Sequence, residues 1–145
     1  MCYRVYVKDE NRMIVNKQEF LPLFITNVGI LKQNPHYEEN LYTIIPYSNS
    51  LIPMRSTELR DKYNKTIFES DIIKVAGNDN RLAIGTVIMN DAGYWAMLTK
   101  DSVFEIPLFE YMDETFRRDK KFSRIEVIGN VYQNSDMVNS LENGV

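Results

Sequence analysis

MRSTELRDKYNKTIFESDIIKV, residues 54–75, combines turn-forming residues, alternating charge and a β-branched run in one stretch of the chain. Residues 61–65 predict a polar turn, because Asp and Asn side chains bond readily to nearby backbone groups. Asp61 is expected to be a structural turn residue, and Asn64 is the residue best able to adopt a left-handed conformation. The apolar pair at residues 67–68 is expected to be buried directly after this turn.

A second turn is expected at residues 69–71, before the β-branched strand at residues 72–75. The Asp71 carboxylate can accept backbone N–H groups there and so set the start of the strand. The alternative is that Glu69 and Asp71 form an acid–base or metal-binding pair, but no further carboxylate lies nearby at suitable spacing. The whole stretch therefore favours a structural joint between strands over an active site.

Around this joint the chain alternates apolar and polar residues more often than it repeats at helical spacing. Such alternation is typical of half-buried strands. The pattern predicts a mainly β fold, all-β or α+β, with short strands that curl into a small barrel and a short C-terminal helix after Asn134 or Ser135. We expect an N-terminal hairpin at residues 3–7 and 13–15, and two irregular or edge segments at residues 20–32 and 41–47. A β-meander is expected at residues 72–75, 82–89 and 94–98, and two later strands at residues 103–109 and 125–132.

With 145 residues, 44% of them hydrophobic, the chain is the size of one ordinary soluble domain. We interpret residues 1–145 as a single domain, in which an N-terminal β extension at residues 1–53 precedes the barrel and C-terminal helix of residues 54–145. The net charge of −3 disfavours a protein whose main task is to coat a polyanion. No apolar stretch reaches the length of a membrane span.

Residues 57–73, TELRDKYNKTIFESDII, resemble the signature of the YopX family of phage and prophage proteins, whose pattern runs roughly TGLKDKNGKEIYEGDIV. Two more blocks agree: IEVIGNVYQNSDMV at residues 125–138 is similar to the family's IEVIGNIYENPELL, and YRVYVKDENRMI at residues 3–14 resembles its opening FRAWDKENKKM. The resemblance implies a β-rich domain with an SH3-like barrel, a phage or prophage origin, and a family without an established activity. It adds no catalytic residue.

Glycine positions are where this chain departs from the family pattern. Glu58, Asn64 and Ser70 stand where the pattern usually has Gly. Of these residues, only Asn tolerates a positive φ easily. We therefore expect the turns at residues 58 and 70 to differ from those of the family.

Few residues remain as candidates for chemistry. His36 is the one histidine of the chain and lies in a polar segment, so a multi-histidine metal site within one chain is excluded. Cys2 is the one cysteine and has no neighbour that would activate its thiol. The glycines show neither a GxGxxG nor a GxxxxGK spacing. We expect no catalytic residue, no metal site and no cofactor, and we expect that the protein is not an enzyme.

The charge of the chain is most uneven late in the sequence, where an acidic run over residues 101–114 gives way to a basic patch. Cations flanked by aromatics resemble a small nucleic-acid contact. The alternative, which we favour, is a solvated loop whose charges pair with a neighbouring subunit or with the acidic run. The basic residues of this patch are Arg117, Arg118, Lys120, Lys121 and Arg124.

Two classes of function stay open. A β-rich domain with 12% aromatic residues offers Tyr and Trp anchors for an interface, which favours a protein–protein adaptor or regulator in the cytoplasm of an infected host. The alternative is a nucleic-acid-binding accessory protein that uses the basic loop at residues 117–124. We expect a homo-oligomer with a host or phage protein as a possible partner, with nucleic acid as the less favoured partner and no membrane association.

Overall fold

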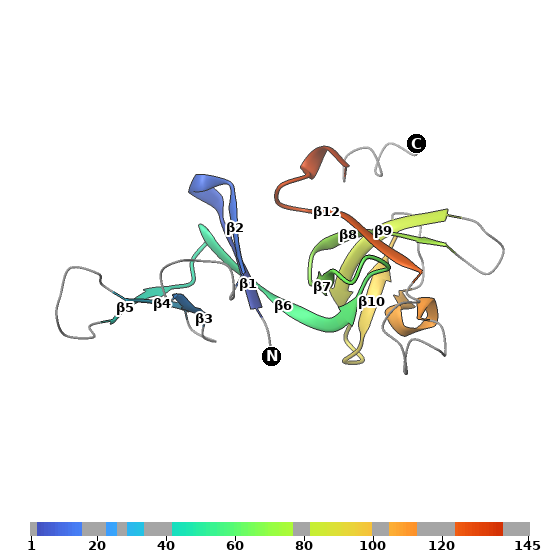
Figure 1. Cartoon of the computed structure of the whole chain (residues 1–145), viewed down its shortest axis with the longest axis horizontal. Helices are drawn as coiled ribbons and strands as arrows, with labels where there is room; N and C mark the ends of the chain where they lie inside the picture. The colour runs from blue at the N-terminus through green and yellow to red at the C-terminus, as the bar shows by residue number, and fades with distance from the viewer. Residues whose placement is uncertain are drawn as a thin grey trace. The chain divides into compact units, whose positions relative to one another are not determined.

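The computed structural model describes residues 3–15, 23–25, 29–33, 42–76, 82–99, 105–112 and 124–137. The chain divides into two compact units, Met1–Arg55 and Ser56–Val145, and Figure 1 labels most of their strands. This division lies close to the boundary at residues 53/54 drawn from the sequence. The assignment of the whole chain to one domain stays a prediction.

The N-terminal hairpin of the first unit is confirmed. Strands β1 (Tyr3–Val7) and β2 (Arg12–Val15) are antiparallel, and β1 also pairs with the beginning of β6 (Leu51–Arg60). Between β1 and β2 runs a short 3-10 turn, η1 (Lys8–Glu10), which ends at Asn11 in a left-handed conformation with φ of 44°. The Tyr6 hydroxyl donates to Asn11 Oδ1 at 2.8 Å and so ties the strand to this turn.

A second sheet of the first unit contains the irregular or edge segments expected from the sequence. Strands β3 (Leu23–Ile25), β4 (Gly29–Gln33) and β5 (Tyr42–Pro46) pair in chain order, each antiparallel to the next. Antiparallel strands can be joined by short connections. The β-branched residues of these segments favour the strand conformation.

In the second unit, the end of β6 pairs irregularly with β7 (Thr66–Phe68). The register shifts between the pairs Ser56↔Phe68 and Arg60↔Thr66. The Thr57 hydroxyl donates to the Ile67 carbonyl at 2.7 Å inside this irregularity. Ile67 and Phe68, expected as a buried pair, are 0% and 5% exposed.

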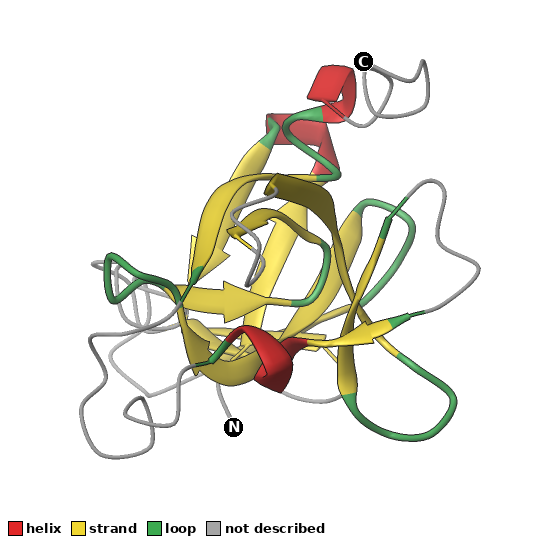
Figure 2. Ribbon diagram, turned by 90° about the vertical axis from the view of Figure 1, so that its right-hand side faces the viewer, coloured by secondary structure: helices red, strands yellow, loops and turns green. Residues whose placement is uncertain are grey.

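The five-stranded sheet of the second unit has the order β11-β10-β9-β8-β12 and is antiparallel throughout. The expected meander is confirmed as three consecutive strands, β8 to β10, and β12 pairs with β8, the first strand of the meander. The strands curve strongly in Figure 2. The mainly β fold is thereby confirmed, and the curled sheet is compatible with an SH3-like barrel. The strands are β8 (Asp71–Ala76), β9 (Leu82–Met89), β10 (Trp95–Leu98), β11 (Ile106–Pro107) and β12 (Ile125–Asn130).

Residues of these strands, together with Ile67 of β7 and Leu108 after β11, make the core of the second unit. Apolar side chains that are fully buried contribute about 1.5–3 kcal/mol each relative to exposure. Strands with period two present such side chains to one face of the sheet. The buried cluster comprises Ile67, Ile73, Val75, Val87, Met97, Leu108 and Ile125.

The strand expected at residues 103–109 is mostly wrong within the described residues. Only Ile106 and Pro107 pair with β10, and Leu108–Tyr111 then form a 3-10 turn, η2. Pro107 has no N–H with which to continue a ladder, and the fully buried Leu108 fixes the turn in the core. The expected strand at residues 125–132 ends at Asn130. After it, the structure describes a helical turn at residues 135–137, and the rest of the expected helix lies outside the described residues.

The turns at residues 58 and 70 have positive φ, as the turn at Asn64 does, and their expected difference from the turns of the family stays a prediction. Glu58 and Ser70 adopt φ of 61° and 69°, close to the 66° of Asn64. All three residues thus take up the left-handed conformation that glycine favours. Hydrogen bonds hold the backbone there: the Glu58 N–H donates to Ser56 Oγ at 2.9 Å, and the Ser70 N–H donates to the Val87 carbonyl at 2.9 Å.

Candidate functional site

The turn at residues 61–65 is organised by one buried carboxylate. Asp61 is 1% exposed. Its Oδ1 accepts the backbone N–H groups of Tyr63 and Lys65, both at 2.9 Å. The backbone closes the same turn, because the Asp61 N–H donates to the Lys65 carbonyl at 2.8 Å and the Asn64 N–H donates to the Asp61 carbonyl at 2.9 Å. These bonds explain why an Asp and a left-handed Asn are required here.

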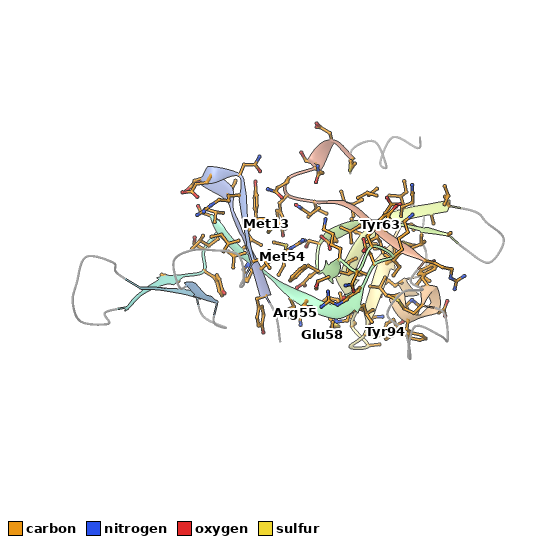
Figure 3. All side chains as sticks on the ribbon, in the orientation of Figure 1. Met13, Met54, Arg55, Glu58, Tyr63 and Tyr94 are labelled. Carbon is orange, nitrogen blue, oxygen red and sulfur yellow. The ribbon has the colours of Figure 1, made fainter. Side chains whose placement is uncertain are left out.

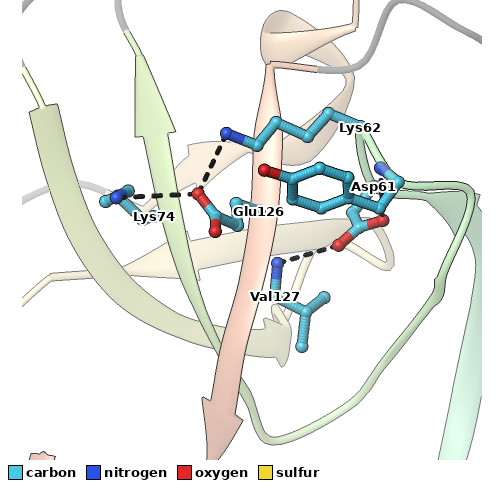
Figure 4. Close-up of polar contacts among 6 residues, drawn as sticks. Asp61, Lys62, Lys74, Glu126 and Val127 are labelled. Carbon is cyan, nitrogen blue, oxygen red and sulfur yellow. Dashed lines mark hydrogen bonds and ion pairs between the residues drawn. The ribbon is translucent and has the colours of Figure 1, made fainter.

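The same turn is bonded to strand β12. Asp61 Oδ2 accepts the Val127 N–H at 3.1 Å, a contact between residues 66 positions apart (Figure 4). The Lys62 N–H donates to the Ile125 carbonyl at 2.8 Å. β12 is the end strand of its sheet, and an end strand presents unpaired backbone groups. The turn therefore covers part of the edge of β12.

Charged side chains form ion pairs beside the contact between this turn and β12. Lys62 Nζ lies 3.0 Å from Glu126 Oε2, and Lys74 Nζ lies 3.6 Å from the same oxygen (Figure 4). The hydrogen bond with Lys62 lowers the pKa of Glu126, and the same bond raises the pKa of Lys62. Because these groups are partly exposed, their attraction is screened by water and contributes little to stability.

Tyr63 lies at the tip of the turn and is 70% exposed. Figure 3 shows it well apart from Tyr94, which is another exposed tyrosine of the second unit. Lys62 Nζ lies 5.0 Å from the centroid of the Tyr63 ring, within cation–π distance. We name residues 60–65 together with Lys74, Arg124 and Glu126 the signature-turn surface.

Asp71 occupies the second turn. It is 1% exposed, and its Oδ2 accepts the Phe68 N–H at 2.8 Å. The neighbouring Ser70 carbonyl accepts the Val131 N–H at 3.0 Å, so this turn also contacts the chain after β12. Both buried aspartates of the signature are thus used to bind backbone N–H groups.

Most of the basic patch identified in the sequence lies outside the described residues, namely Arg117, Arg118, Lys120 and Lys121. Arg124 is described. Its backbone N–H donates to the Tyr111 carbonyl at 3.1 Å, and its Nη2 donates to the Glu110 carbonyl at 2.6 Å. Arg124 therefore joins the start of β12 to η2, which gives it a structural contribution that the sequence did not indicate.

The other candidates for chemistry add no site. His36 and Cys2 lie outside the described residues. Within the described ranges, no group of three or more His, Cys, Asp or Glu side chains could hold a metal ion. In that same part of the chain, no helix has the length and apolar character needed to cross a membrane.

The sequence profile described as YopX protein matches residues 2–139. The chain belongs to the YopX family. Its similarity to solved structures extends over most of the chain: protein yopX from Bacillus subtilis aligns with 94% of this chain and 96% of its own, at 21% identity and a TM-score of 0.60. Protein EF1440 from Enterococcus faecalis aligns over the same shares of 94% and 96%, at 18% identity and a TM-score of 0.54. At these identities the two structures show a common fold. No curated protein sequence matches the chain significantly.

Sequence reasoning about the YopX signature missed two features of this surface. It assigned Asp61 to the turn but did not connect it with β12, because pairing between residues 66 positions apart has no local signal. It also gave no role to Tyr63. A large aromatic residue between Lys62 and Asn64, at the tip of a polar turn, was the signal available for an exposed ring.

Proposed function

We propose that this YopX-family chain is a non-enzymatic accessory protein of phage or prophage origin, acting as a protein–protein adaptor or regulator in the host cytoplasm. Exposed apolar side chains of the second unit carry the proposal. Leu82 is 66% exposed and Phe109 is 60% exposed, and Leu98 and Tyr94 are 40% and 37% exposed. Large apolar and aromatic side chains are the usual anchors of protein interfaces.

Support for a non-enzymatic function comes from how the buried carboxylates are used. Asp61 and Asp71 are the buried acids of the signature, and both accept backbone N–H groups. A carboxylate used in this way holds a turn together rather than presenting a base to a substrate. Membership of the YopX family supports the phage or prophage origin.

A pull-down from host lysate tests the adaptor function. The tagged chain should recover a discrete protein whether or not the lysate is treated with nuclease, and Phe109→Ser should lose that protein because an interface anchor is removed. Asp91→Asn, a change at an exposed polar position, is the matched control and should retain it. Recovery of no discrete protein, or equal recovery by Phe109→Ser, would contradict the proposal.

The second candidate is a nucleic-acid-binding accessory protein that uses the loop at residues 117–124. One observation favours it. The Lys62 N–H donates to the carbonyl of Ile125, and Arg124 directly precedes Ile125, so the end of the basic loop lies beside the cationic signature turn. Replacing Arg117, Arg118, Lys120 and Lys121 by Gln should weaken binding and reduce its salt dependence. Arg124 is kept in this variant because of its bonds to η2. Unchanged salt-dependent binding would exclude the loop as the contact.

A further inference from the structure

The Tyr63 side chain is not among the groups that close the turn by hydrogen bonds to the backbone, and its contact within the turn is with the neighbouring Lys62 side chain. Asp61 binds the backbone N–H of Tyr63, not its side chain, and the ring is 70% exposed. Any residue except proline could donate that N–H. An exposed aromatic on an otherwise polar turn is therefore a candidate for contact with another molecule.

The turn holds this ring on a rigid base. Its backbone is fixed by the hydrogen bonds of Asp61 and by the bond from Lys62 to β12. Arg60 Nη1 donates to the Asn64 carbonyl at 3.0 Å and spans the turn from outside. A ring presented from a fixed backbone loses little entropy when a ligand stacks on it.

The surroundings of the ring are cationic, in a chain whose net charge is −3. Residues 60–65 carry Arg60, Lys62 and Lys65 against one carboxylate, Asp61, which is buried and directed at N–H groups. Lys62 lies near the ring, and Lys65 is exposed. Glu126 offsets part of this charge through Lys62 and Lys74. The outward face of the turn is thus positive, with an aromatic at its tip.

We propose that the signature-turn surface binds single-stranded nucleic acid, with a base stacked on Tyr63 and the adjacent phosphates held by Lys62 and Lys65. Unpaired bases expose the π-faces that a tyrosine can stack on, whereas the bases of a duplex are already stacked. A protein anchor would be expected among other apolar side chains, but the neighbours of Tyr63 in the turn are polar or charged. The inference rests on the nucleic-acid function, not on the adaptor function, and the three residues to which it assigns contacts, Lys62, Tyr63 and Lys65, lie outside the 117–124 loop.

Fluorescence anisotropy with a labelled oligothymidylate of about 12 nucleotides tests the proposal on the full chain. Tyr63→Ala should weaken binding about tenfold, since stacking on one aromatic is lost, while Tyr63→Phe should stay within about twofold. Tyr94→Ala, at an exposed tyrosine elsewhere in the second unit, is the matched control and should bind like the parent. The same sequence as a duplex should bind more weakly than the single strand.

Salt titrations separate the ring from the cations. Lys65→Gln should reduce the salt slope by about one, because one phosphate contact is removed, and Tyr63→Ala should leave the slope unchanged. Since Trp95 is the one native tryptophan, Tyr63→Trp adds a reporter at the site, and its emission should be quenched when the oligonucleotide is added. Thermal melts of each variant should match the parent because the altered side chains are exposed.

Each failure has its own meaning. Absence of saturable binding by the parent would overturn both the inference and the nucleic-acid function. A second outcome is that Tyr63→Ala binds the oligonucleotide like the parent, whereas the variant neutralised at residues 117–121 does not bind it. This outcome would overturn the inference but not the nucleic-acid function. A host protein lost with Tyr63→Ala, without any oligonucleotide binding, would show that this surface docks a protein and would also overturn it.

Discussion

At the scale of single residues, Asp61 shows how one side chain can join two distant segments. Its two carboxylate oxygens accept three backbone N–H groups, two within the turn and one from Val127 on β12. Hydrogen bonds to a charged acceptor are stronger than those between neutral groups, and burial strengthens them further. The turn and the edge of the sheet therefore depend on the same carboxylate.

Replacing Asp61 by Ala should lower the free energy of unfolding by about 3 kcal/mol, because three N–H groups lose their acceptor. Asp61→Asn should recover only about half of this loss. The amide oxygen can serve the turn, but its NH₂ group then faces the N–H of Val127. Urea unfolding of both variants measures the difference. An Asn variant as stable as the parent would show that the bond to β12 contributes nothing.

At Ser70, which has a left-handed backbone conformation, we predict a substitution that raises the free energy of unfolding. Its φ of 69° is unfavourable for a residue with a side chain, whereas its backbone bonds to Val87 and Val131 need none. Ser70→Gly should therefore stabilise the protein by about 0.5–1 kcal/mol. Lys65→Gly, at an exposed position without a positive φ, should destabilise it. Thermal melts would contradict the argument if both variants shifted in the same direction.

At the scale of elements, β12 connects the parts of the second unit. It pairs with β8, and its register shifts between Val127 and Gly129. After the bulge, Asn134 Oδ1 accepts the Asn130 N–H at 3.0 Å. A bulge bends a strand and increases its twist. The turn after β12 is also bonded to the end of the strand through its backbone, because the Asn134 N–H donates to the Asn130 carbonyl at 2.9 Å.

Two glycines of this sheet should differ in their response to Ala. A Cβ at Gly85 would lie 2.6 Å from the Leu98 carbonyl oxygen, which is backbone of the paired strand, whereas one at Gly129 would lie 2.6 Å from Asn134 Oδ1, which is side chain. We expect Gly85→Ala to cost about 3 kcal/mol and Gly129→Ala about 1–2 kcal/mol.

A double-mutant cycle checks this assignment by urea unfolding. Asn134→Ala removes the obstructing side chain. The double variant Gly129→Ala/Asn134→Ala should therefore lose less unfolding free energy than the sum of the losses in the two single variants. The same Asn134 change should not relieve Gly85→Ala. Strictly additive losses at residues 129 and 134 would mean that the clash is not the cause of the instability.

Glu126 should make stability depend weakly on pH. Its pKa is lowered in the folded state, first by the hydrogen bond with Lys62, so its contribution is present above the ordinary glutamate pKa and is lost as the pH falls through the lowered pKa. Glu126→Gln should thus be slightly less stable than the parent at neutral pH and equal to it in acid. Unfolding measured over a pH series tests this. In a Lys62→Gln background the pH-dependent difference should shrink, and an unchanged difference would point to another partner.

At the scale of the whole molecule, the chain divides into Met1–Arg55 and Ser56–Val145, and strand β6 (Leu51–Arg60) runs across this division. In the first unit, β2 is the end strand of the sheet β2-β1-β6-β7, and β3 and β5 are the end strands of the sheet β3-β4-β5. Sheet edges of this kind offer backbone groups to another chain, and native proteins usually cover them. The edges of the first unit are therefore where we expect copies of the chain to meet.

We expect the protein to be a homo-oligomer. Light scattering at micromolar concentration and moderate salt should give a mass at least twice the 17.0 kDa of one chain. Proline placed at Met13 in β2, where it would remove a backbone donor from an edge strand, should weaken the assembly if this edge pairs. A parent that scatters as a monomer would contradict the prediction.

The sequence by itself determined the local features of this protein. Alternating residues predicted the N-terminal hairpin and the meander, and Asp61, Asn64 and Asp71 were placed in turns by side-chain chemistry that acts within a few residues. The ordered signature blocks identified the YopX family. All of these signals lie within short segments, so they can be recognised without knowledge of what packs against them.

Only the tertiary structure decided what those segments contact. It paired β12 with β8, turned Leu108–Tyr111 into a 3-10 turn around a buried Leu108, and held Glu58 and Ser70 at positive φ. Local propensity opposes positive φ at both residues. At Ser70 the strain is offset by backbone hydrogen bonds to Val87 and Val131, formed across the fold, and at Glu58 by the local bond from its N–H to Ser56 Oγ. The signature-turn surface arose in the same way: Lys62 and Glu126 meet because β12 returns to the turn, and no local pattern specifies that return.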